Sequence, residues 1–191
     1  MNREKQQLLK LWVGRLWLLG PERLWLASIA LRGGGHWVLA FFLKQLNALL
    51  YSNSLGTGAT VSPDVRLGHN SIGIVVSDDV EIGKRVKIWQ NVTLSAGRPA
   101  RPPEGEGEGA PASSRQRSRI VIEDDVKIGA NAVVIAPRGA TLRIGHGARI
   151  GAGTVLTRDV PAQSIVVGPP ARIIDPQDVT DETAAQLGPG D

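Results

Sequence analysis

The chain of 191 residues contains no cysteine, only three histidines and few aromatic residues. Without cysteine, disulfide frameworks, cysteine-based zinc sites and thiol nucleophiles are excluded. A zinc site built from several histidines is not expected from His36, His69 and His146 alone, so we expect no metal. A catalytic base that titrates near neutral pH must be sought among the same three side chains.

The sequence also has little excess charge outside its N-terminal segment. Residues 1–50 contain seven Lys or Arg and two Glu, whereas residues 51–191 contain fifteen basic and sixteen acidic residues. A basic excess confined to one segment does not indicate a nucleic-acid-binding domain, and we expect no nucleic-acid partner. Within residues 1–50 the longest uncharged stretch is residues 33–43. This stretch is shorter than the roughly 18 residues that a membrane-spanning helix needs.

Residues 1–51 are rich in Leu and Trp, and their periodicity predicts two or three amphipathic helices that are interrupted at residues 33–35. We expect these helices to dock on the main domain or on another subunit. Contact with a membrane surface through Trp12, Trp17 and Trp25 is the less favoured alternative. A cytoplasmic location is expected.

From Leu55 onward an aliphatic residue recurs every six positions. A period of six is typical of short strands joined by tight turns, in which each aliphatic side chain points inward and stacks on its equivalent one coil away. Three such hexads make one triangular coil. An open coil end exposes unpaired strands, so we expect the N-terminal helices or the C-terminal tail to cap it. The recurring residues are Leu55, Val61 and Leu67; Val76, Ile82, Ile88 and Leu94; Ile122, Ile128 and Val134; and Ile144, Ile150 and Leu156.

The positions where the period fails predict surface loops. The interval from Leu67 to Val76 is three residues too long and contains His69. Residues 98–119, rich in Pro, Gly, Glu, Ser and Arg, predict a flexible loop. The expected organisation is a helical segment at 1–51, a solenoid at 52–174 with the loop insertion 98–119, and a flexible acidic tail at 175–191.

The three histidines differ in their sequence context. His36 follows a glycine run and precedes an apolar helix, which favours a position at the start of that helix. His146 occupies a turn position of a regular hexad, where exposed polar residues are expected. His69 alone lies where the repeat is interrupted, and this context favours a functional loop residue over a plain surface loop.

Two segments resemble a known family. Residues 59–97 contain LGHNSIGIVV followed by QNVTL, and residues 120–174 contain IGANAVV, IGAGTVLTRDVP and VVGPPARII. These motifs resemble the serine O-acetyltransferases, which are hexapeptide-repeat acyltransferases. The resemblance implies a mainly β fold, a left-handed parallel β-helix with a short N-terminal α-helical segment. It also implies assembly as a homotrimer or a dimer of trimers.

The resemblance implies a chemistry as well. His69 would be the general base that deprotonates a hydroxyl of L-serine, or of a serine-like small molecule, for attack on acetyl-CoA, a reaction of cysteine biosynthesis. The donor would lie in a groove between subunits, with Arg172 facing its phosphates. Its pantetheine arm would contact small residues of the later coils, which also simply fit tight β-helix corners. These small residues are Gly129, Ala130, Gly151 and Ala152.

The sequence departs from the family pattern near His69. Ser54 stands where the family has the aspartate that orients the histidine, and Gly68 replaces a second aspartate. Candidates to orient His69 instead are Ser54, Asn53, Asn70 or a backbone carbonyl. A further family histidine has no counterpart and falls near Arg117, which with Arg115 and Arg119 is a candidate to bind an acceptor carboxylate. The candidate substrate-binding residues are Asn70, Asn91 and Arg117, with Trp89 as a further pocket residue.

Two alternatives stay open. The same chemistry can serve a sugar, a polysaccharide or a specialised metabolite as acceptor, because the departures from the family pattern affect substrate contacts. Alternatively, the solenoid is a non-catalytic scaffold, which the missing orienting carboxylate and the irregular loop 98–119 favour.

Overall fold

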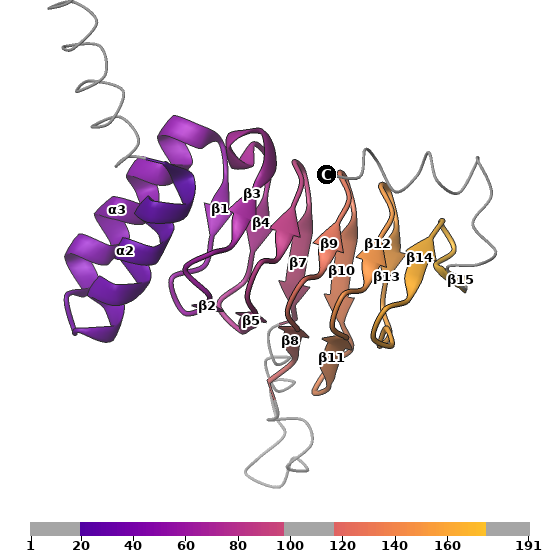
Figure 1. Cartoon of the computed structure of the whole chain (residues 1–191). Coiled ribbons are helices and arrows are strands. Elements are labelled where there is room, and N and C mark those ends of the chain that lie inside the picture. The colour runs from indigo at the N-terminus through magenta and orange to yellow at the C-terminus, as the bar shows by residue number, and fades with distance from the viewer. Residues whose placement is uncertain (1–19, 98–116, 175–191) are drawn as a thin grey trace, which may run out of the picture.

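The computed structural model describes residues 20–97 and 117–174, which form two helices followed by a prism of stacked short strands (Figure 1). Helix α2 (Pro21–Gly33) begins with Pro at its first position and has Glu22 in its first turn, both favourable at a helix N-terminus. Helix α3 (Trp37–Tyr51) begins after His36, as the sequence predicts, although the side chain of His36 makes no capping hydrogen bond.

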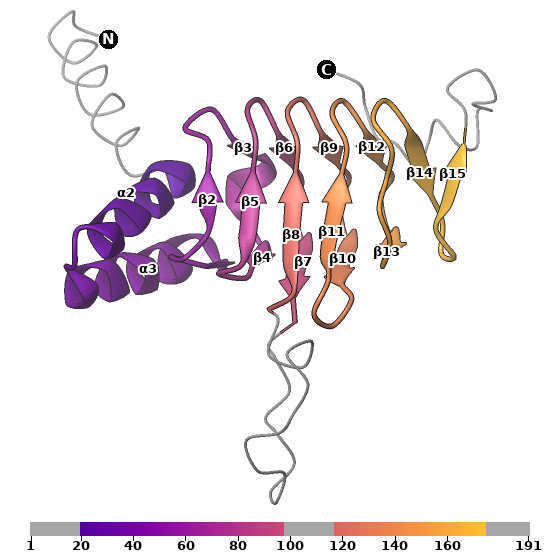
Figure 2. The ribbon, with the colours of Figure 1, turned by 90° about the horizontal axis from the view of Figure 1, so that it is seen from below.

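The strands form three sheets, one on each side of the prism. Sheet A consists of β1 (Ser54–Leu55), β4 (Val75–Val76), β7 (Thr93–Ala96), β10 (Val133–Ala136) and β13 (Val155–Leu156). Sheet B consists of β2 (Thr60–Val61), β5 (Val80–Ile82), β8 (Arg119–Ile122) and β11 (Thr141–Ile144), which lie side by side in Figure 2. Sheet C consists of β3 (Arg66–Leu67), β6 (Lys87–Ile88), β9 (Lys127–Ile128), β12 (Arg149–Ile150), β14 (Ile165–Val167) and β15 (Arg172–Ile174).

The hexad residues form the core, as the sequence predicts. In sheet A the inward row runs in register from Leu55 through Val76, Leu94 and Val134 to Leu156, and each of these side chains is buried. The pairing within the solenoid is parallel. Three parallel sheets of stacked hexads are the architecture of the left-handed β-helix, so the predicted fold is confirmed.

The solenoid continues beyond Leu156, the last of the recurring hexad residues. Val166 pairs with Ile150 and adds another inward residue to sheet C. The chain then reverses at Gly168, whose φ is 109°, and β15 pairs antiparallel to β14. Val166 falls outside the regular hexad series because the interval from Ile150 is shorter than a regular coil.

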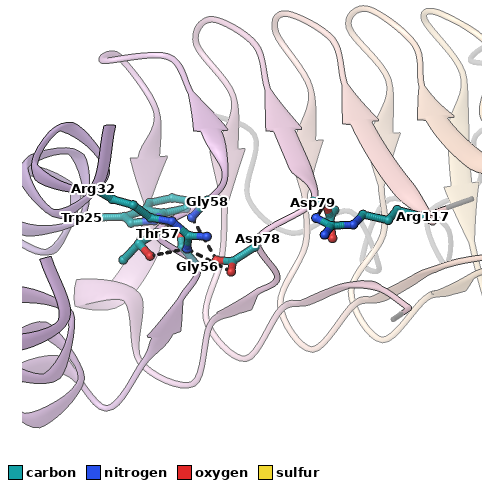
Figure 3. A network of polar contacts seen from close by, with 8 residues as sticks. All are labelled: Trp25, Arg32, Gly56, Thr57, Gly58, Asp78, Asp79 and Arg117. Atoms are coloured by element: carbon teal, nitrogen blue, oxygen red, sulfur yellow. Dashed lines mark hydrogen bonds and ion pairs between the residues drawn. The ribbon is translucent and has the colours of Figure 1, made fainter. Parts of the chain in front are cut away.

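Helix α2 caps the first coil. The side chain of Trp25 is 1% exposed, and its indole N–H donates a 2.8 Å hydrogen bond to the carbonyl of Gly56 (Figure 3). Arg32 donates to Thr57 Oγ1 at 2.8 Å and to Asp78 Oδ2 at 3.1 Å. These contacts hold the helix on the open end of the solenoid. The alternative of Trp25 as a membrane contact is therefore wrong, while Trp12 and Trp17 lie outside the described residues.

The outward face of α3 is apolar. Leu49 is 80% exposed, and Lys44 is the only charged residue of the helix. No helix among residues 20–97 and 117–174 combines the length and the hydropathy required for a membrane span. The other exposed apolar side chains of α3 are Trp37, Val38, Leu39, Phe41, Phe42, Leu46 and Leu50.

Candidate active site

The interruption that contains His69 forms a tight loop between sheets C and A. Strand β3 ends at Leu67, and a short 3-10 turn spans Gly68–Ser71. His69, Asn70 and Ser71 have φ values of 48°, 54° and 61°. Three consecutive non-glycine residues in the left-handed region are strained, and such strain clusters at functional sites. The turn leaves the side chain of His69 exposed.

A series of hydrogen bonds between buried polar side chains holds this loop against the helices. Asn53 Nδ2 donates to Ser71 Oγ at 2.8 Å and to Asn47 Oδ1 at 3.1 Å. Asn47 Nδ2 in turn donates to the carbonyl of Pro21 at 2.9 Å. The side chains of Asn47, Asn53 and Ser71 are all buried, that of Ser71 completely. The position of the His69 loop is therefore coupled to the packing of α2 and α3.

The corner between sheets C and A gathers most of the predicted site residues. We call it the C–A corner, and it consists of residues 68–74, 89–92, 129–132 and 151–154. Gly68 lies directly over Trp89, because a Cβ at position 68 would be 3.3 Å from Trp89 Cα. Asn91 lies against Gly73, and its N–H donates to the carbonyl of Ile72 at 2.9 Å. The corner thus carries His69, Asn70, Asn91, Gly129, Ala130, Gly151 and Ala152.

Among the small residues of the later coils, Gly129 is required by the stacking itself. A Cβ on Gly129 would lie 2.6 Å from the backbone nitrogen of Ala152. The N–H of Gly129 donates to the carbonyl of Ile150, and the N–H of Gly153 donates to the carbonyl of Ala130. Close packing of two coils therefore explains why Gly129 is a glycine, with or without a ligand beside it.

Other predicted site residues lie elsewhere. Ser54 is exposed in β1, and among the described residues no hydrogen bond joins it to His69. Arg117 lies at the corner between sheets A and B, where its guanidinium is 3.7 Å from Asp79 (Figure 3). Arg172 is exposed in β15 at the far end of sheet C. Arg115 lies outside the described residues.

A groove lies beside the His69 loop, between α2 and the outer face of sheet C. Its volume is about 1040 Å³, and its walls include Gly68, Trp89 and Leu26. It contains five cationic side chains and three carboxylates. The cations are Arg23, Arg66, Arg85, Lys87 and Lys127, and the carboxylates are Glu22, Asp64 and Asp125.

The carboxylates of the groove are bound by neighbouring groups. Asp125 accepts hydrogen bonds from Arg85 Nε at 2.7 Å and from Arg85 Nη2 at 2.6 Å, and this pairing lowers the pKa of Asp125. A hydrogen bond from Ser62 lowers the pKa of Asp64. Glu22 Oε1 accepts the N–H of Leu67 at 2.9 Å. The lowered pKa values keep Asp64 and Asp125 ionised at neutral pH.

The sequence did not single out three buried oxygens that lack hydrogen-bond partners. They are Asn53 Oδ1, Gln90 Oε1 and Thr154 Oγ1, as judged over the described residues. Gln90 and Thr154 belong to the C–A corner, in coils that follow the His69 loop. A buried oxygen without a partner is an acceptor that a water or a ligand can use. No sequence pattern marks these residues, because the burial of each oxygen depends on how separate coils stack.

Comparisons with known proteins agree with this arrangement. The family model described as "hexapeptide repeat of succinyl-transferase" matches residues 119–158. The chain is 32% identical over 123 residues to serine acetyltransferase from Bacillus licheniformis, covering 62% of this chain and 49% of that protein. It is 32% identical over 145 residues to the Synechococcus elongatus enzyme of the same name, covering 73% and 52%. The chain belongs to the serine acetyltransferase family of hexapeptide-repeat proteins.

Solved structures of the family share the fold. The soybean serine acetyltransferase apoenzyme superposes with a TM-score of 0.63 at 28% identity, over 80% of this chain and 55% of that one. Neisseria gonorrhoeae serine acetyltransferase in complex with serine gives a TM-score of 0.61 at 27% identity, over 81% and 56%. The chain thus spans about half the length of these members of the family. The resemblance seen in the sequence motifs is confirmed at the level of family and fold.

Proposed function

We propose that the protein is a CoA-dependent O-acetyltransferase with His69 as its general base. The observation that carries the proposal is the position of His69, exposed on a strained loop at the C–A corner, on the same corner as the half-buried Ala130 and Ala152 of the later coils. Its relatives are named serine acetyltransferases. Acetyl-CoA is the donor that those names imply, and no metal is needed for this chemistry.

The reaction needs one proton carrier. A nitrogen of His69 takes the proton of the acceptor hydroxyl while the oxygen attacks the carbonyl carbon of the acetyl thioester. The tetrahedral intermediate then collapses, the carbon–sulfur bond breaks, and the CoA thiolate takes the proton from the imidazolium. The products are an acetyl ester and CoA. Histidine suits this role because its ordinary pKa lies close to neutral pH.

The donor is proposed to lie along the C–A corner. Backbone groups of Gly129, Ala130, Gly151 and Ala152 would line its pantetheine arm, and Arg172 would face its phosphates. Asn70 and Asn91 would contact the acceptor beside His69. Ser54 is proposed to orient the imidazole in the complex, because catalytic hydrogen bonds that are open without substrate can close when it binds.

The site is proposed to be completed by a second copy of the chain in a homotrimer. The outward residues of sheet A carry no charge over the strands described, and Val75, Ile135 and Val155 are each more than 40% exposed. Helix α3, whose outward face is also apolar, packs against β1 of the same sheet. Exposed aliphatic side chains gathered on an uncharged face are typical of association between copies. Arg117, at a different corner from His69 in one chain, would then approach the His69 of a neighbour.

L-Serine or a serine-like molecule is the acceptor that the relatives suggest, and a sugar hydroxyl is the second candidate. The second candidate is favoured by Ser54 and Gly68, which remove two carboxylates that the family pattern has near its histidine. The test is an acceptor screen with purified protein and acetyl-CoA, in which release of CoA is measured with serine, neutral sugars and acidic sugars. Release with any acceptor supports the proposal. If CoA is released with none of them, the chain is a scaffold and not an enzyme.

A further inference from the structure

The outer face of sheet C carries four cationic side chains in register. Arg66 on β3 is paired with Lys87 on β6, Lys87 with Lys127 on β9, and Lys127 with Arg149 on β12. We call these four residues the basic ladder. Neighbouring strands lie about 4.8 Å apart, so the ladder runs for roughly 14 Å along the axis of the solenoid.

Stacking like charges on adjacent strands has a cost in stability. Three carboxylates lie in the same groove, but each binds another group: Glu22 binds Leu67, Asp64 binds Ser62 and Asp125 binds Arg85. The groove contains five cationic side chains and three carboxylates, so cations outnumber acids. Arg149 adds a further cation at the far end of the ladder. This excess of cations gives the face a positive potential. The count includes Lys87 and Lys127 together with the contacts that each of them makes.

The other two faces of the prism do not share this pattern. The outward residues of sheet A are uncharged in the strands described. On sheet B, Arg119 of β8 forms a 2.6 Å ion pair with Glu81 of the adjacent strand β5. Arg143 on β11 is a further outward cation of sheet B, so that face carries two cations and one acid on its strands, whereas sheet C carries four cations in register.

The ladder leads directly to the proposed catalytic loop. Arg66 is three residues before His69 in the chain, and Gly68 is a wall of the groove that holds Arg66, Lys87 and Lys127. Trp89, which lies beneath Gly68, lines the same groove. An anionic chain on the ladder would therefore present its hydroxyl groups close to the exposed imidazole of His69.

We propose that the outer face of sheet C binds an acidic polysaccharide, which is the acetyl acceptor of the enzyme. The proposal rests on the proposed function and names its substrate class. A polysaccharide offers both requirements of the site: carboxylates that recur along an extended chain for the ladder, and hydroxyl groups for His69. A single serine-sized acceptor would occupy only one rung.

A single-stranded nucleic acid fits the face less well. Such ligands are bound by several aromatic side chains on which successive bases stack. In the groove, Trp89 is the one aromatic residue among the described lining residues. The repeated element of this face is charge, which selects a chain of anions without a stacking surface.

The proposal is tested by binding of the full-length protein to polygalacturonate, with neutral dextran and single-stranded DNA as comparison ligands. Arg66→Gln/Arg149→Gln removes two exposed rungs. Arg138→Gln/Arg143→Gln is the matched control, because it removes the same charge from exposed positions away from sheet C. We expect the ladder variant to bind polygalacturonate at least tenfold more weakly than wild type, and the control to stay within twofold. Binding should weaken as salt is raised.

A second arm measures transfer of the acetyl group from acetyl-CoA to polygalacturonate, with ester formation detected by mass spectrometry. We expect acetylation that falls in the ladder variant in parallel with binding. The proposal is overturned if the wild-type protein binds dextran as tightly as polygalacturonate, or binds single-stranded DNA more tightly. It is also overturned if the ladder variant and the control variant bind polygalacturonate equally well. Loss of CoA binding in the ladder variant, with polygalacturonate binding unchanged, also overturns it. Intact ladder-dependent binding without acetyl transfer to any acceptor supports the surface and contradicts the proposed function instead.

Discussion

Asn53 donates a 2.8 Å hydrogen bond from its side-chain amide to Ser71 Oγ, and both residues are buried. Ser71 is the last residue of the turn that presents His69. Because Asn53 also binds Asn47 on α3, the helices and the candidate active site share one buried polar chain. The helical segment is therefore part of the support of the site as well as the cap of the solenoid.

Replacing Asn53 by Leu should loosen the His69 loop. The substitution leaves Ser71 Oγ and Asn47 Oδ1 without their donor, and each buried group left unsatisfied costs about 1–3 kcal/mol. We expect a lower midpoint in urea unfolding and faster amide hydrogen exchange across residues 68–74. Ser54→Ala, at the neighbouring exposed position, is the stability control. Unchanged exchange in Asn53→Leu would show that the loop is held by other contacts.

Glycine at position 73 should be needed for space as well as for backbone conformation. Gly73 and Gly153 both have a φ of 68°, but the Cβ position of Gly73 is occupied by Asn91, whereas nothing lies within 4 Å at Gly153. Alanine at either position should cost about 1 kcal/mol for the backbone. At position 73 a steric cost of about 1–3 kcal/mol should be added. Equal unfolding free energies for Gly73→Ala and Gly153→Ala would contradict this interpretation.

Asp78 should make the cap of the solenoid sensitive to acid. Burial raises the pKa of Asp78, but the N–H of Gly58 and the guanidinium of Arg32 outweigh it and hold the pKa below its ordinary value of 3.8. The stabilisation is therefore present above pH 3.8 and is lost as the pH falls through the lowered value. A half-exposed pair contributes about 0.2–1 kcal/mol.

Asp78→Asn is expected to unfold more easily than wild type at pH 7, with a smaller difference between the two at pH 3. Thermal unfolding at both pH values measures this difference. Asp159→Asn, which changes another exposed aspartate that accepts a backbone N–H, is a suitable control for the change in charge. A difference between wild type and Asp78→Asn that grows towards pH 3 would contradict the sign of the effect.

Val155→Glu should disrupt the proposed association of copies. Val155 is 42% exposed on β13, an edge strand of the uncharged sheet A, and a carboxylate there would be buried in the interface. We expect a folded protein of lower mass by light scattering, with acetyl transfer reduced in parallel. Thr141→Glu, on the edge strand of sheet B, should keep the mass of the wild type. A wild-type protein that is already monomeric would exclude the trimer.

The fold was predictable because its signal is local and repeated. Leu55, Val76 and Leu94 each mark an inward position within a six-residue window, and thirteen such positions follow the same pattern. The interruption at His69 was visible for the same reason, as a failure of that period. Val166 was missed because its coil is shorter than the others.

The contacts that complete the site depend on distant pairing. The sequence could place Asn53 near His69 only as one candidate among several, since its bond to Ser71 requires the start of β1 to stack on the start of β4. The basic ladder was hidden for a related reason. Lys87 and Lys127 lie forty positions apart, separated by the loop insertion, and only the strand register places them side by side. The ion pair between Arg117 and Asp79 also joins residues that are distant in the sequence, so no local pattern predicts it.

The central claim, that His69 is the base of an acetyl transfer, is tested most directly by the rate of CoA release in His69→Ala. The control is His146→Ala, an exposed histidine at the corner between sheets B and C. With the acceptor that the screen identifies, His69→Ala should lose about 10²–10⁴-fold in kcat/KM, while His146→Ala keeps the wild-type rate. A His69→Ala protein that is folded and releases CoA at the wild-type rate would contradict the account.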